Sequence, residues 1–487
     1  MKGWHFVGVV AVFLLLVWPI VASFSSGLWG PAEPFVNGDF NGGWWLWWAT
    51  SEFFRGTDWT LAVAHPEGAV SLARVIPNPT DMFVLGAFGP PSVLKWNLVQ
   101  LVHVLATLLA GVHLARVAGA SRFSSLAAAC LVAGSPVMLH EVAGGRPSNL
   151  IVWPALLSLA ALVQEKPVRS GFWAAVQTVL YLWHGASLFL IGLVLVRDKR
   201  VALRALFAAG VLVLPYLLWL LVGNDGVPSQ APPAGYTALP LSGLWGIDGV
   251  PERFQVHPLL LPVALLALKG HRRWLAAGAV GLVVSVGPWP TWALGEPLFA
   301  GPMAWIEWCL PPFERMHHPV RASLIALPVL GVAVALGLDA FARGRWVAAA
   351  LVVLVVWHPS EVRRAATYDA PAEIPFSDVR IPGEGPVVDL LGMIHRSALS
   401  AQTVHERSIS EPLLFRRGNS PIAQGLEALA EGGQVDDGLW RQLENQGFEM
   451  VLVWDRVGNR PEVQREVEQA LGPPVAPGVY RLSGWSR

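Results

Sequence analysis

Residues 197–222 read RDKRVALRALFAAGVLVLPYLLWLLV, a basic cluster followed by an apolar run long enough to cross a lipid bilayer. This arrangement recurs along the chain, because basic residues lie in every second connection between apolar runs. These residues are Arg116 and Arg122, Lys166 and Arg169, Arg197 with Lys199 and Arg200, Lys269 with Arg272 and Arg273, and Arg343 with Arg345. The alternate connections are longer and contain most of the acids. The positive-inside rule therefore predicts that the basic connections lie in the cytoplasm and the acidic loops outside it.

The composition is that of a membrane protein, because 54% of the 487 residues are hydrophobic and only 14% are charged. A soluble globule of this length would need more polar surface than these residues supply. The formal net charge is zero, which argues against nucleic acid as a partner, since nucleic-acid-binding proteins normally carry a basic face. Membrane lipids are therefore the expected surroundings of the chain.

The apolar runs predict a mainly α polytopic membrane protein with about eleven transmembrane helices, the amino terminus inside and the carboxyl terminus outside. The runs are Phe6 to Phe24, Val93 to Leu114, Ser124 to Leu139, Leu150 to Val163, Phe172 to Trp183, Ala186 to Val196, Leu203 to Val222, Pro258 to Leu268, Trp274 to Val286, Val320 to Leu338 and Trp346 to Trp357. The first run also fits a cleavable signal peptide, and either interpretation leaves the next loop outside. One tilted helix over residues 172–196 would place the cluster at Arg197 outside. We therefore expect two short helices that meet at an external turn near His184 and Gly185.

The composition changes after Pro359, where acids, Arg and Gln return and no further run is long enough to span a bilayer. Residues 1–358 are therefore expected to form a transmembrane domain that includes a long external loop at 25–94, and residues 359–487 a soluble external α/β domain. We predict short strands and helices in this tail: strands at Val387 to Leu391, Met450 to Trp454 and Val479 to Leu482, and helices at Pro421 to Ala430 and Arg460 to Leu471. Its polar stretch from Gln402 to Arg407 fits either a solvated connection or a substrate contact.

The first external loop concentrates polar residues in a chain that is otherwise poor in charge. It opens with Asn37-Gly38-Asp39-Phe40-Asn41-Gly42-Gly43 and continues into Trp44-Trp45-Leu46-Trp47-Trp48, which is typical of a helix in the membrane interface. Asp39 is then expected beside an aromatic wall, where a carboxylate can accept a proton from a hydroxyl and indole faces suit sugar rings or prenyl chains. Asp39 fits equally well as the cap of the helix that follows.

Other polar residues of this loop are candidates for contacts to a substrate, namely Glu52, Asp58, His65 and Glu67. Their oxygen and imidazole groups are also ligands that a divalent cation such as Mg or Mn accepts. The spacing between them is not diagnostic of a metal site.

Several short motifs resemble the GT-C superfamily of integral-membrane glycosyltransferases. They are Gly38-Asp39 and the Trp-rich segment, the turn at His65-Pro66-Glu67-Gly68, Lys95-Trp96-Asn97, Gly144-Gly145-Arg146 before Trp153-Pro154, the stretch from Arg315 to Arg321, and Gln402-Thr403-x-His405. The layout is similar to that of bacterial relatives of the protein O-mannosyltransferases and the lipid A aminoarabinose transferases, over nearly the full chain. The resemblance implies a protein of the bacterial plasma membrane whose C-terminal domain lies in the periplasm.

The resemblance also implies an activity, the transfer of a sugar, with inversion, from a polyprenyl-phosphate carrier to a lipid, glycan or protein acceptor on the external side. Asp39 matches the position of the general base. This sequence has no Asp-Asp or Asp-Glu doublet there, which some relatives carry.

A donor of this kind is confined to the bilayer with its phosphate at the headgroup level, where cations neutralise the leaving phosphate. Basic residues are predicted at that level, near the external helix ends: Arg146, Arg315, His317, His318 and Arg321. Together with Trp44, Trp48 and the polar residues of the loop they are the candidates for donor binding, and His184 is a further one. Arg321 also fits a side chain that snorkels to the headgroups.

Two other classes of protein remain open, a lipid or glycan transporter or flippase and a non-catalytic assembly protein of the envelope. A transporter usually shows repeated halves and ionisable groups near the middle of the membrane. Here the apolar runs are almost free of charge and no repeat is visible. An assembly protein would use the large external domain to bind a partner without chemistry.

Overall fold

The computed structural model describes residues 7–11, 14, 38–57, 84–143, 146–222, 238–245, 255–293, 296–309, 318–340, 344–357, 379–390, 402–404, 406–409, 425–426, 428–429, 437–453 and 461–482. The chain forms two compact units. The first, which we call the helical unit, comprises Met1–Trp29 and Leu94–Asp369. The second, which we call the loop-and-tail unit, comprises Gly30–Val93 and Ala370–Arg487. Most of the first long loop thus belongs with the C-terminal tail.

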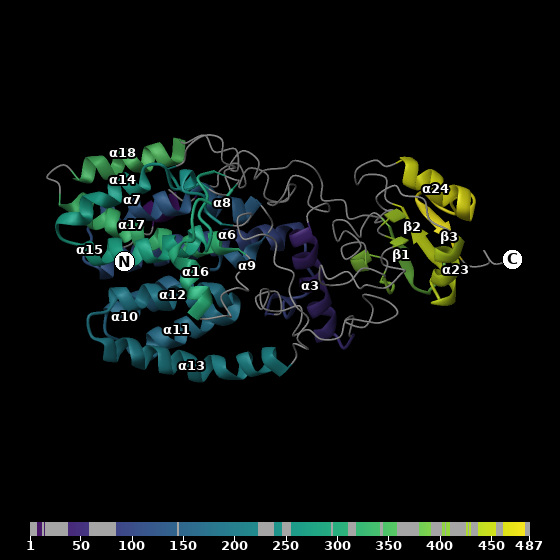
Figure 1. Ribbon diagram of the computed structural model, residues 1–487, viewed down its shortest axis with the longest axis horizontal. Helices are drawn as coiled ribbons and strands as arrows, with labels where there is room; N and C mark the ends of the chain where they lie inside the picture. Colours follow the sequence, from purple (N-terminus) through teal and green to yellow (C-terminus); the bar gives the residue numbers. More distant parts are fainter. Residues whose placement is uncertain are drawn as a thin grey trace. The chain divides into compact units, whose positions relative to one another are not determined.

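The helical unit is built from α-helices and short 3-10 helices (Figure 1). They are α6 (Val93–Val117), α7 (Arg122–Ala133), α8 (Pro136–Ala143), α9 (Pro147–Leu150), α10 (Trp153–Val163), α11 (Pro167–Leu180), α12 (Leu182–Leu195), α13 (Lys199–Val222), η4 (Ser242–Trp245), α14 (Leu260–Ala264), η6 (Leu265–Lys269), α15 (Arg272–Val286), α16 (Pro302–Cys309), η8 (Pro319–Ala322), α17 (Ser323–Asp339) and α18 (Gly344–Trp357).

Several of these helices are suited to a bilayer. Among the described residues, three helical runs are long and apolar enough to cross a membrane: Val93–Val117, Lys199–Leu218 and Pro319–Asp339. Shorter apolar helices accompany them, at Arg122–Ala133, Trp153–Val163, Leu182–Leu195 and Gly344–Val355. The protein is therefore a multi-pass membrane protein, and the number of about eleven crossings stays a prediction.

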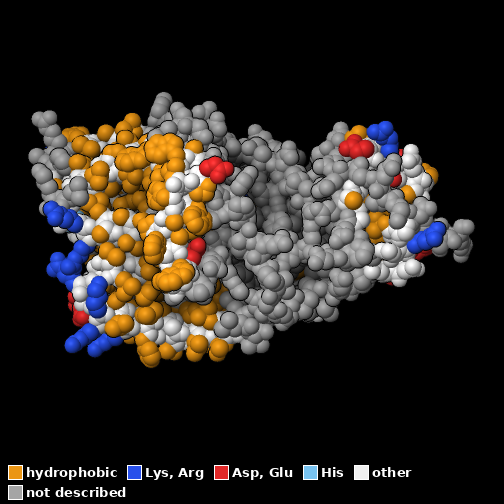
Figure 2. All heavy atoms as spheres, viewed as in Figure 1, with side chains coloured by type: hydrophobic (Ala, Val, Ile, Leu, Met, Phe, Trp, Pro, Cys, Tyr) orange, Lys and Arg blue, Asp and Glu red, His pale blue; other side chains and the backbone are white. Residues whose placement is uncertain are grey.

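Two helices of this unit show opposite kinds of apolar surface. Every residue of α17 from Ser323 to Leu338 is buried, and the helix packs against α7, α14 and α15. A helix that is apolar on all sides and enclosed by other helices forms a core. In α13, by contrast, Leu203 and Phe207 are exposed, Phe207 over 74% of its surface. Figure 2 shows hydrophobic side chains spread over this unit, with Lys and Arg side chains gathered at one end.

The structure breaks the predicted crossing at Ser124 to Leu139 into two helices. α7 ends at Ala133, where the N–H of Gly134 donates to the carbonyl oxygens of Cys130 and Val132. α8 then begins at Pro136. Proline fixes its own backbone angle and lacks an N–H, so it starts a helix more readily than it continues one. The predicted run at Ser124 to Leu139 therefore holds two helices, α7 and the first part of α8.

The prediction of two helices within residues 172–196 is confirmed, with a shift in the position of the turn. The backbone of Tyr181 is extended, with φ −155° and ψ 105°, and it separates α11 from α12. The sequence predicts the turn at His184 and Gly185, but both residues lie inside the first turn of α12. The break falls at Tyr181 because its N–H still donates to the carbonyl oxygen of Gln177 while its extended backbone redirects the chain.

Glycine allows close helix packing at the centre of the unit. A Cβ atom on Gly281 of α15 would lie 2.6 Å from the Cβ of Ala326 and 3.0 Å from the Cδ1 of Ile191. A Cβ on Gly210 of α13 would meet nothing within 4 Å. Replacing each of these two glycines by Ala therefore distinguishes the destabilisation caused by a steric clash from the stabilisation caused by a higher helix propensity.

We expect Gly281→Ala to destabilise the protein by about 1 to 3 kcal/mol, because the added methyl group overpacks α15 against α17. Gly210→Ala should leave stability unchanged or raise it by up to about 1 kcal/mol, since Ala favours a helix over Gly. Thermal unfolding of both variants in the same detergent makes the comparison. Equal midpoints would contradict the close approach at Gly281.

The loop-and-tail unit contains α3 (Gly38–Phe54) and a three-stranded sheet with strand order β1-β2-β3. The strands are β1 (Val387–Asp389), β2 (Met450–Leu452) and β3 (Val479–Arg481). β1 runs parallel to β2, with Val388 paired to Val451, and β3 runs antiparallel to β2, with Tyr480 paired to Val451. Each strand falls within a segment that we predicted as a strand.

Helices complete the tail around this sheet, namely α23 (Asp437–Asn445) and α24 (Pro461–Leu471). Trp440 of α23 and Val463 of α24 lie in one core with Val451 and Tyr480. The sequence predicted α24 but not α23. Most of the predicted helix at Pro421 to Ala430 lies outside the described residues.

Candidate functional site

A buried carboxylate lies between two arginines at the end of the helical unit where α8 ends and η8 begins. Glu141 is in the last turn of α8, Arg146 lies in the connection that follows, and Arg321 is in η8. The Glu141 Oε1 atom is 3.5 Å from Arg146 Nη1 and 3.8 Å from Arg321 Nε. Glu141 and Arg321 are only 4% and 7% exposed, whereas the Arg146 side chain is 23% exposed. We call these three residues the Arg–Glu–Arg cluster.

Neighbouring side chains hold the cluster in place. Asn149 Nδ2 donates to Glu141 Oε2 at 2.6 Å. Arg321 Nη1 donates to the hydroxyl of Tyr181 at 3.1 Å, and its guanidinium carbon lies 5.7 Å from the centre of the Tyr181 ring. The helix break at Tyr181 thus presents an aromatic hydroxyl to Arg321. A buried ion pair with such supporting hydrogen bonds is held in one geometry.

His184 lies behind Tyr181, with ring centres 4.4 Å apart. Its Nδ1 atom is 3.3 Å from Gln177 Nε2, which also donates to the carbonyl oxygen of Ile151 at 2.8 Å. Gln177 Oε1 in turn accepts from the backbone N–H of Ala155 at 3.2 Å. Gln177 therefore links α11 to the beginning of α10 and to His184 of α12. His184 in turn packs against the ring of Tyr181.

The charges of the cluster decide the ionisation of Glu141, which lies beyond the end of the predicted span. Burial by itself would raise the pKa of this carboxyl. The cations Arg321 and Arg146, the neighbouring His140 and the hydrogen bond from Asn149 outweigh burial and lower the pKa from its ordinary value of 4.5 to about 2. Glu141 is therefore a carboxylate at neutral pH.

We expect acid to destabilise the protein through Glu141. Because the pKa is lower in the folded chain, the ionised carboxylate stabilises the fold above a pH of about 4.5. This contribution, on the order of 3 kcal/mol, is lost as the pH falls from 4.5 toward 2. Thermal unfolding between a pH of about 6 and about 3 should therefore show a larger loss for the wild type than for Glu141→Gln, which does not titrate. The same loss in both proteins would contradict this assignment.

The cluster lies at the end of the helical unit opposite to the exposed basic connections. Arg321 is near the start of the run Pro319–Asp339, and the exposed Arg345 follows its other end. This run of 21 residues has a length of roughly 30 Å, the thickness of a bilayer core. α12 runs in the same direction between the two ends of the unit, since Tyr181 precedes it at the cluster end and the exposed Arg197 follows it at the basic end.

The structure brings together some of the residues that the sequence marked and leaves others apart. Arg146 and Arg321 meet on Glu141, and His184 contacts Tyr181. His318 directly precedes η8. Arg315 and His317, and the loop residues Asp58, His65 and Glu67, lie outside the described residues.

The Trp side chains of α3 have different surroundings from those expected. Asp39 is in the first turn of α3. Trp44 and Trp48 are each only 5% exposed, so their indole rings pack inside the protein and not on an open membrane surface. Glu52 forms an ion pair with Arg55, with Glu52 Oε1 and Arg55 Nη1 2.6 Å apart.

Sequence reasoning missed Glu141, Asn149 and Tyr181. One signal was present, because Glu141 is the only acid between Arg122 and Glu165 and lies just before Arg146. An isolated acid in an apolar region usually has a basic partner. Asn149 and Tyr181 carried no comparable signal, since polar residues at helix ends are common.

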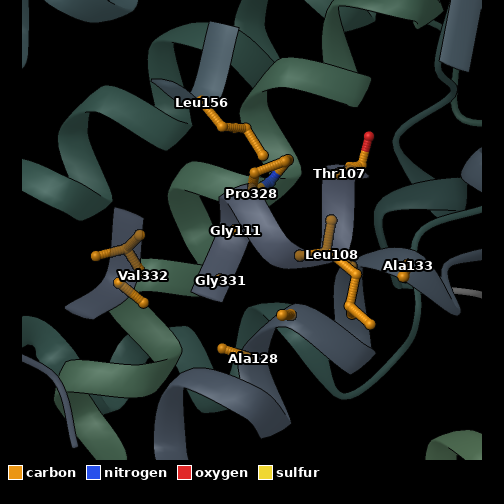
Figure 3. Close-up of a pocket in the computed structure, with 12 residues that line it drawn as sticks. Thr107, Leu108, Gly111, Ala128, Ala133, Leu156, Pro328, Gly331 and Val332 are labelled. Atoms are coloured by element: carbon orange, nitrogen blue, oxygen red, sulfur yellow. The ribbon is translucent and has the colours of Figure 1, made fainter. Parts of the chain in front are cut away.

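The structure offers no resident metal site in the part of the chain that it describes. No three His, Cys, Asp or Glu side chains there lie close enough together to hold an ion. A cavity does lie between α6, α7, α10 and α17, lined by Thr107, Leu108, Gly111, Ala128, Leu156 and Gly331 among others (Figure 3). Its volume of about 10 Å³ is at most that of one water molecule. It is a packing defect of the core and not a substrate site.

The arrangement of the helices matches known membrane enzymes. The structure of the arabinofuranosyltransferase AftD from Mycobacteria superimposes with a TM-score of 0.59 and 16% identity, over 96% of this chain and 37% of AftD. The oligosaccharyltransferase of Archaeoglobus fulgidus, solved with a tethered acceptor peptide, gives a TM-score of 0.56 and 12% identity, over 93% of this chain and 69% of that protein. The fold of this chain is therefore similar to those of two solved glycosyltransferases.

This chain spans little more than a third of the length of AftD. No family model and no curated protein sequence matches it. The resemblance that the short motifs suggested is therefore confirmed at the level of the fold. The Arg–Glu–Arg cluster gives this fold a pair of cations held on one carboxylate.

Proposed function

We propose that the protein is a membrane glycosyltransferase that moves a sugar, with inversion, from a polyprenyl-phosphate donor to an acceptor outside the cytoplasm. The observation that carries this proposal is the Arg–Glu–Arg cluster, which lies at the helix ends opposite to the exposed basic connections. The GT-C fold supports it, since both solved structures named above are of glycosyltransferases.

In the proposed reaction, Arg146 and Arg321 take the charge of the lipid phosphate. The bond between the anomeric carbon and the phosphate oxygen breaks, and the phosphate leaves with an added negative charge. Two guanidinium groups stabilise that charge most strongly where water is scarce. The Glu141 carboxylate orients both arginines, which removes the need to reorganise them during the reaction.

Asp39 is the proposed general base. It accepts the proton of the acceptor hydroxyl as that oxygen attacks the anomeric carbon, and a single displacement of this kind inverts the configuration.

We further propose that residues 1–358 form the membrane domain with an external loop at 25–94, and that residues 359–487 form an external domain, in the periplasm of a bacterium. The positive-inside rule supports this orientation, since the basic connections lie at the end opposite to Arg321. The grouping of Gly30–Val93 with Ala370–Arg487 in one compact unit supports placing the first long loop and the tail on the same side.

The test uses purified full-length protein in nanodiscs with synthetic farnesyl-phosphate donors that carry arabinofuranose or mannose. Membranes serve as the source of acceptor, and the released farnesyl phosphate is measured. Time-dependent release from at least one donor is the expected result. If both donors bind without release, and proteoliposomes carry a fluorescent polyprenyl phosphate across the bilayer, the protein is a flippase and the proposal is wrong.

A further inference from the structure

α3 is fixed to the C-terminal tail by one buried hydrogen bond. The indole Nε1–H of Trp45 donates to Gln402 Oε1 at 2.7 Å, across a separation of 357 residues. Both side chains are fully buried. A buried indole N–H normally has a partner, because its loss of water is otherwise uncompensated. The bond therefore has a defined geometry and is not a surface contact.

Gln402 continues this connection into the tail. Its Nε2 donates to the backbone carbonyl oxygen of Arg407 at 2.9 Å. Arg407 donates through Nε to the Gly385 carbonyl oxygen at 2.6 Å and through Nη1 to that of Pro382 at 2.8 Å. Gln402 and Arg407, at the two ends of this stretch, are buried and bonded, whereas Val404 and Glu406 between them are exposed.

The connection ends on the sheet itself. Arg407 Nη2 lies 3.0 Å from Glu449 Oε2, and Glu449 is the residue before β2. The same Glu449 oxygen accepts from the backbone N–H of Gly385 at 2.8 Å, two residues before β1. A Cβ on Gly385 would lie 2.4 Å from the Glu449 carboxyl carbon, so a larger residue there would displace the Glu449 side chain. Trp45 is therefore linked to the beginning of two strands through the buried Gln402 and Arg407 and the half-buried Glu449.

A second contact holds α3 from the other side. The indole N–H of Trp47 donates to the carbonyl oxygen of Gly89 at 2.9 Å. Trp45 and Trp47 are two positions apart, roughly 200° around the helix axis, so they point to opposite sides of α3. On the Trp47 side, a Cβ on Gly86 would lie 2.3 Å from Thr50 Oγ1, which shows how closely that segment approaches the helix.

We propose that Trp45 and Gln402 are positioning residues, through which the C-terminal tail holds α3 and thereby sets the place of Asp39. The proposal rests on the proposed function, because it takes Asp39 as the general base. Asp39 and Trp45 lie in one helix, separated by less than two turns. Because a helix is stiff, contacts that fix its middle also fix its first turn, which contains Asp39. A base displaced by about 1 Å loses much of its catalytic effect.

The first measurement does not depend on activity. Hydrogen–deuterium exchange of the full-length protein should show faster exchange of the α3 amides in Gln402→Leu, while β1, β2 and β3 keep their protection. Gln402→Glu retains an acceptor oxygen for the Trp45 N–H but loses the donor to the Arg407 carbonyl oxygen, so the protection of α3 should lie between that of the wild type and that of Gln402→Leu. The control is Trp440→Phe, which changes a buried Trp of the tail core and should affect the sheet but not α3.

The second measurement is donor turnover. We expect Trp45→Phe and Gln402→Leu each to lower kcat at least tenfold while the donor KM changes less than about twofold, because the arginines that bind the phosphate are untouched. The double variant should be no slower than the slower single variant, since both changes break the same hydrogen bond.

The outcomes separate this proposal from the proposed function. Unchanged exchange of α3 in Gln402→Leu, or faster exchange with an unchanged kcat, overturns the positioning role while wild-type turnover still supports the glycosyltransferase. A wild type that turns over neither donor overturns the proposed function and the catalytic half of this proposal with it. The exchange of α3 still decides whether the tail holds the helix.

Discussion

Asp39→Asn should lower the rate of sugar transfer by roughly 100- to 10,000-fold, the usual contribution of a general base. The amide has nearly the shape of the carboxylate but does not accept a proton from the acceptor hydroxyl. Donor binding should change little, because the cations proposed for the phosphate are Arg146 and Arg321. Release of farnesyl phosphate under single-turnover conditions measures the rate of the chemical step.

The matched control for this variant is Glu462→Gln. Glu462 is an exposed acid in the first turn of α24, so the same exchange of carboxylate for amide should leave the rate unchanged. Thermal unfolding shows whether both variants are folded. Wild-type turnover by a folded Asp39→Asn protein would remove this residue from the mechanism.

Arg321→Gln should destabilise the protein by about 3 to 5 kcal/mol, because it leaves the Glu141 carboxylate buried without one of its two guanidinium partners. Arg321 is 7% exposed and Glu141 4%, so water replaces little of the lost interaction. Adding Glu141→Gln to the same protein should restore part of the stability, since the uncompensated charge is then absent. Thermal and denaturant unfolding in detergent measure all three proteins.

Arg146→Gln provides the comparison at the same cluster. Its side chain is 23% exposed and 3.5 Å from Glu141, so this change should cost about 1 kcal/mol or less in stability. It should weaken donor binding more than it lowers the unfolding midpoint, which a donor titration followed by thermal shift resolves. A loss of stability as large as that of Arg321→Gln would contradict the argument that the greater solvent exposure of Arg146 makes its substitution less destabilising.

Local patterns predicted much of this fold because they depend on neighbouring residues. Short β-branched and apolar runs predict the strands at Val387, Met450 and Val479. The basic cluster at Arg197 predicts that two helices, α11 and α12, precede it and not one. Arg146 stood out as a cation near an external helix end. In each case the deciding information lies within a few positions of the residue.

Pairings between distant parts of the chain were not predictable in the same way. Glu141 meets Arg321 and Trp45 meets Gln402 only after the helices and the tail have folded. The Trp-rich segment has the composition of an interfacial helix, but its indoles are buried because partners from remote segments cover them. The composition of a segment indicates that its side chains prefer an apolar environment. It does not indicate whether lipid or protein surrounds them.

The bond between Trp45 and Gln402 has a consequence for biosynthesis. A ribosome adds about 5 to 20 residues per second, so roughly 20 to 70 s separate the synthesis of the two partners, which lie 357 residues apart. During that time the newly made Trp45 indole lacks its acceptor, and any chaperone that shields nascent aromatic segments has a target there. A premature stop codon before Gln402 would therefore give a truncated protein in which Trp45 of α3 lacks the Gln402 acceptor.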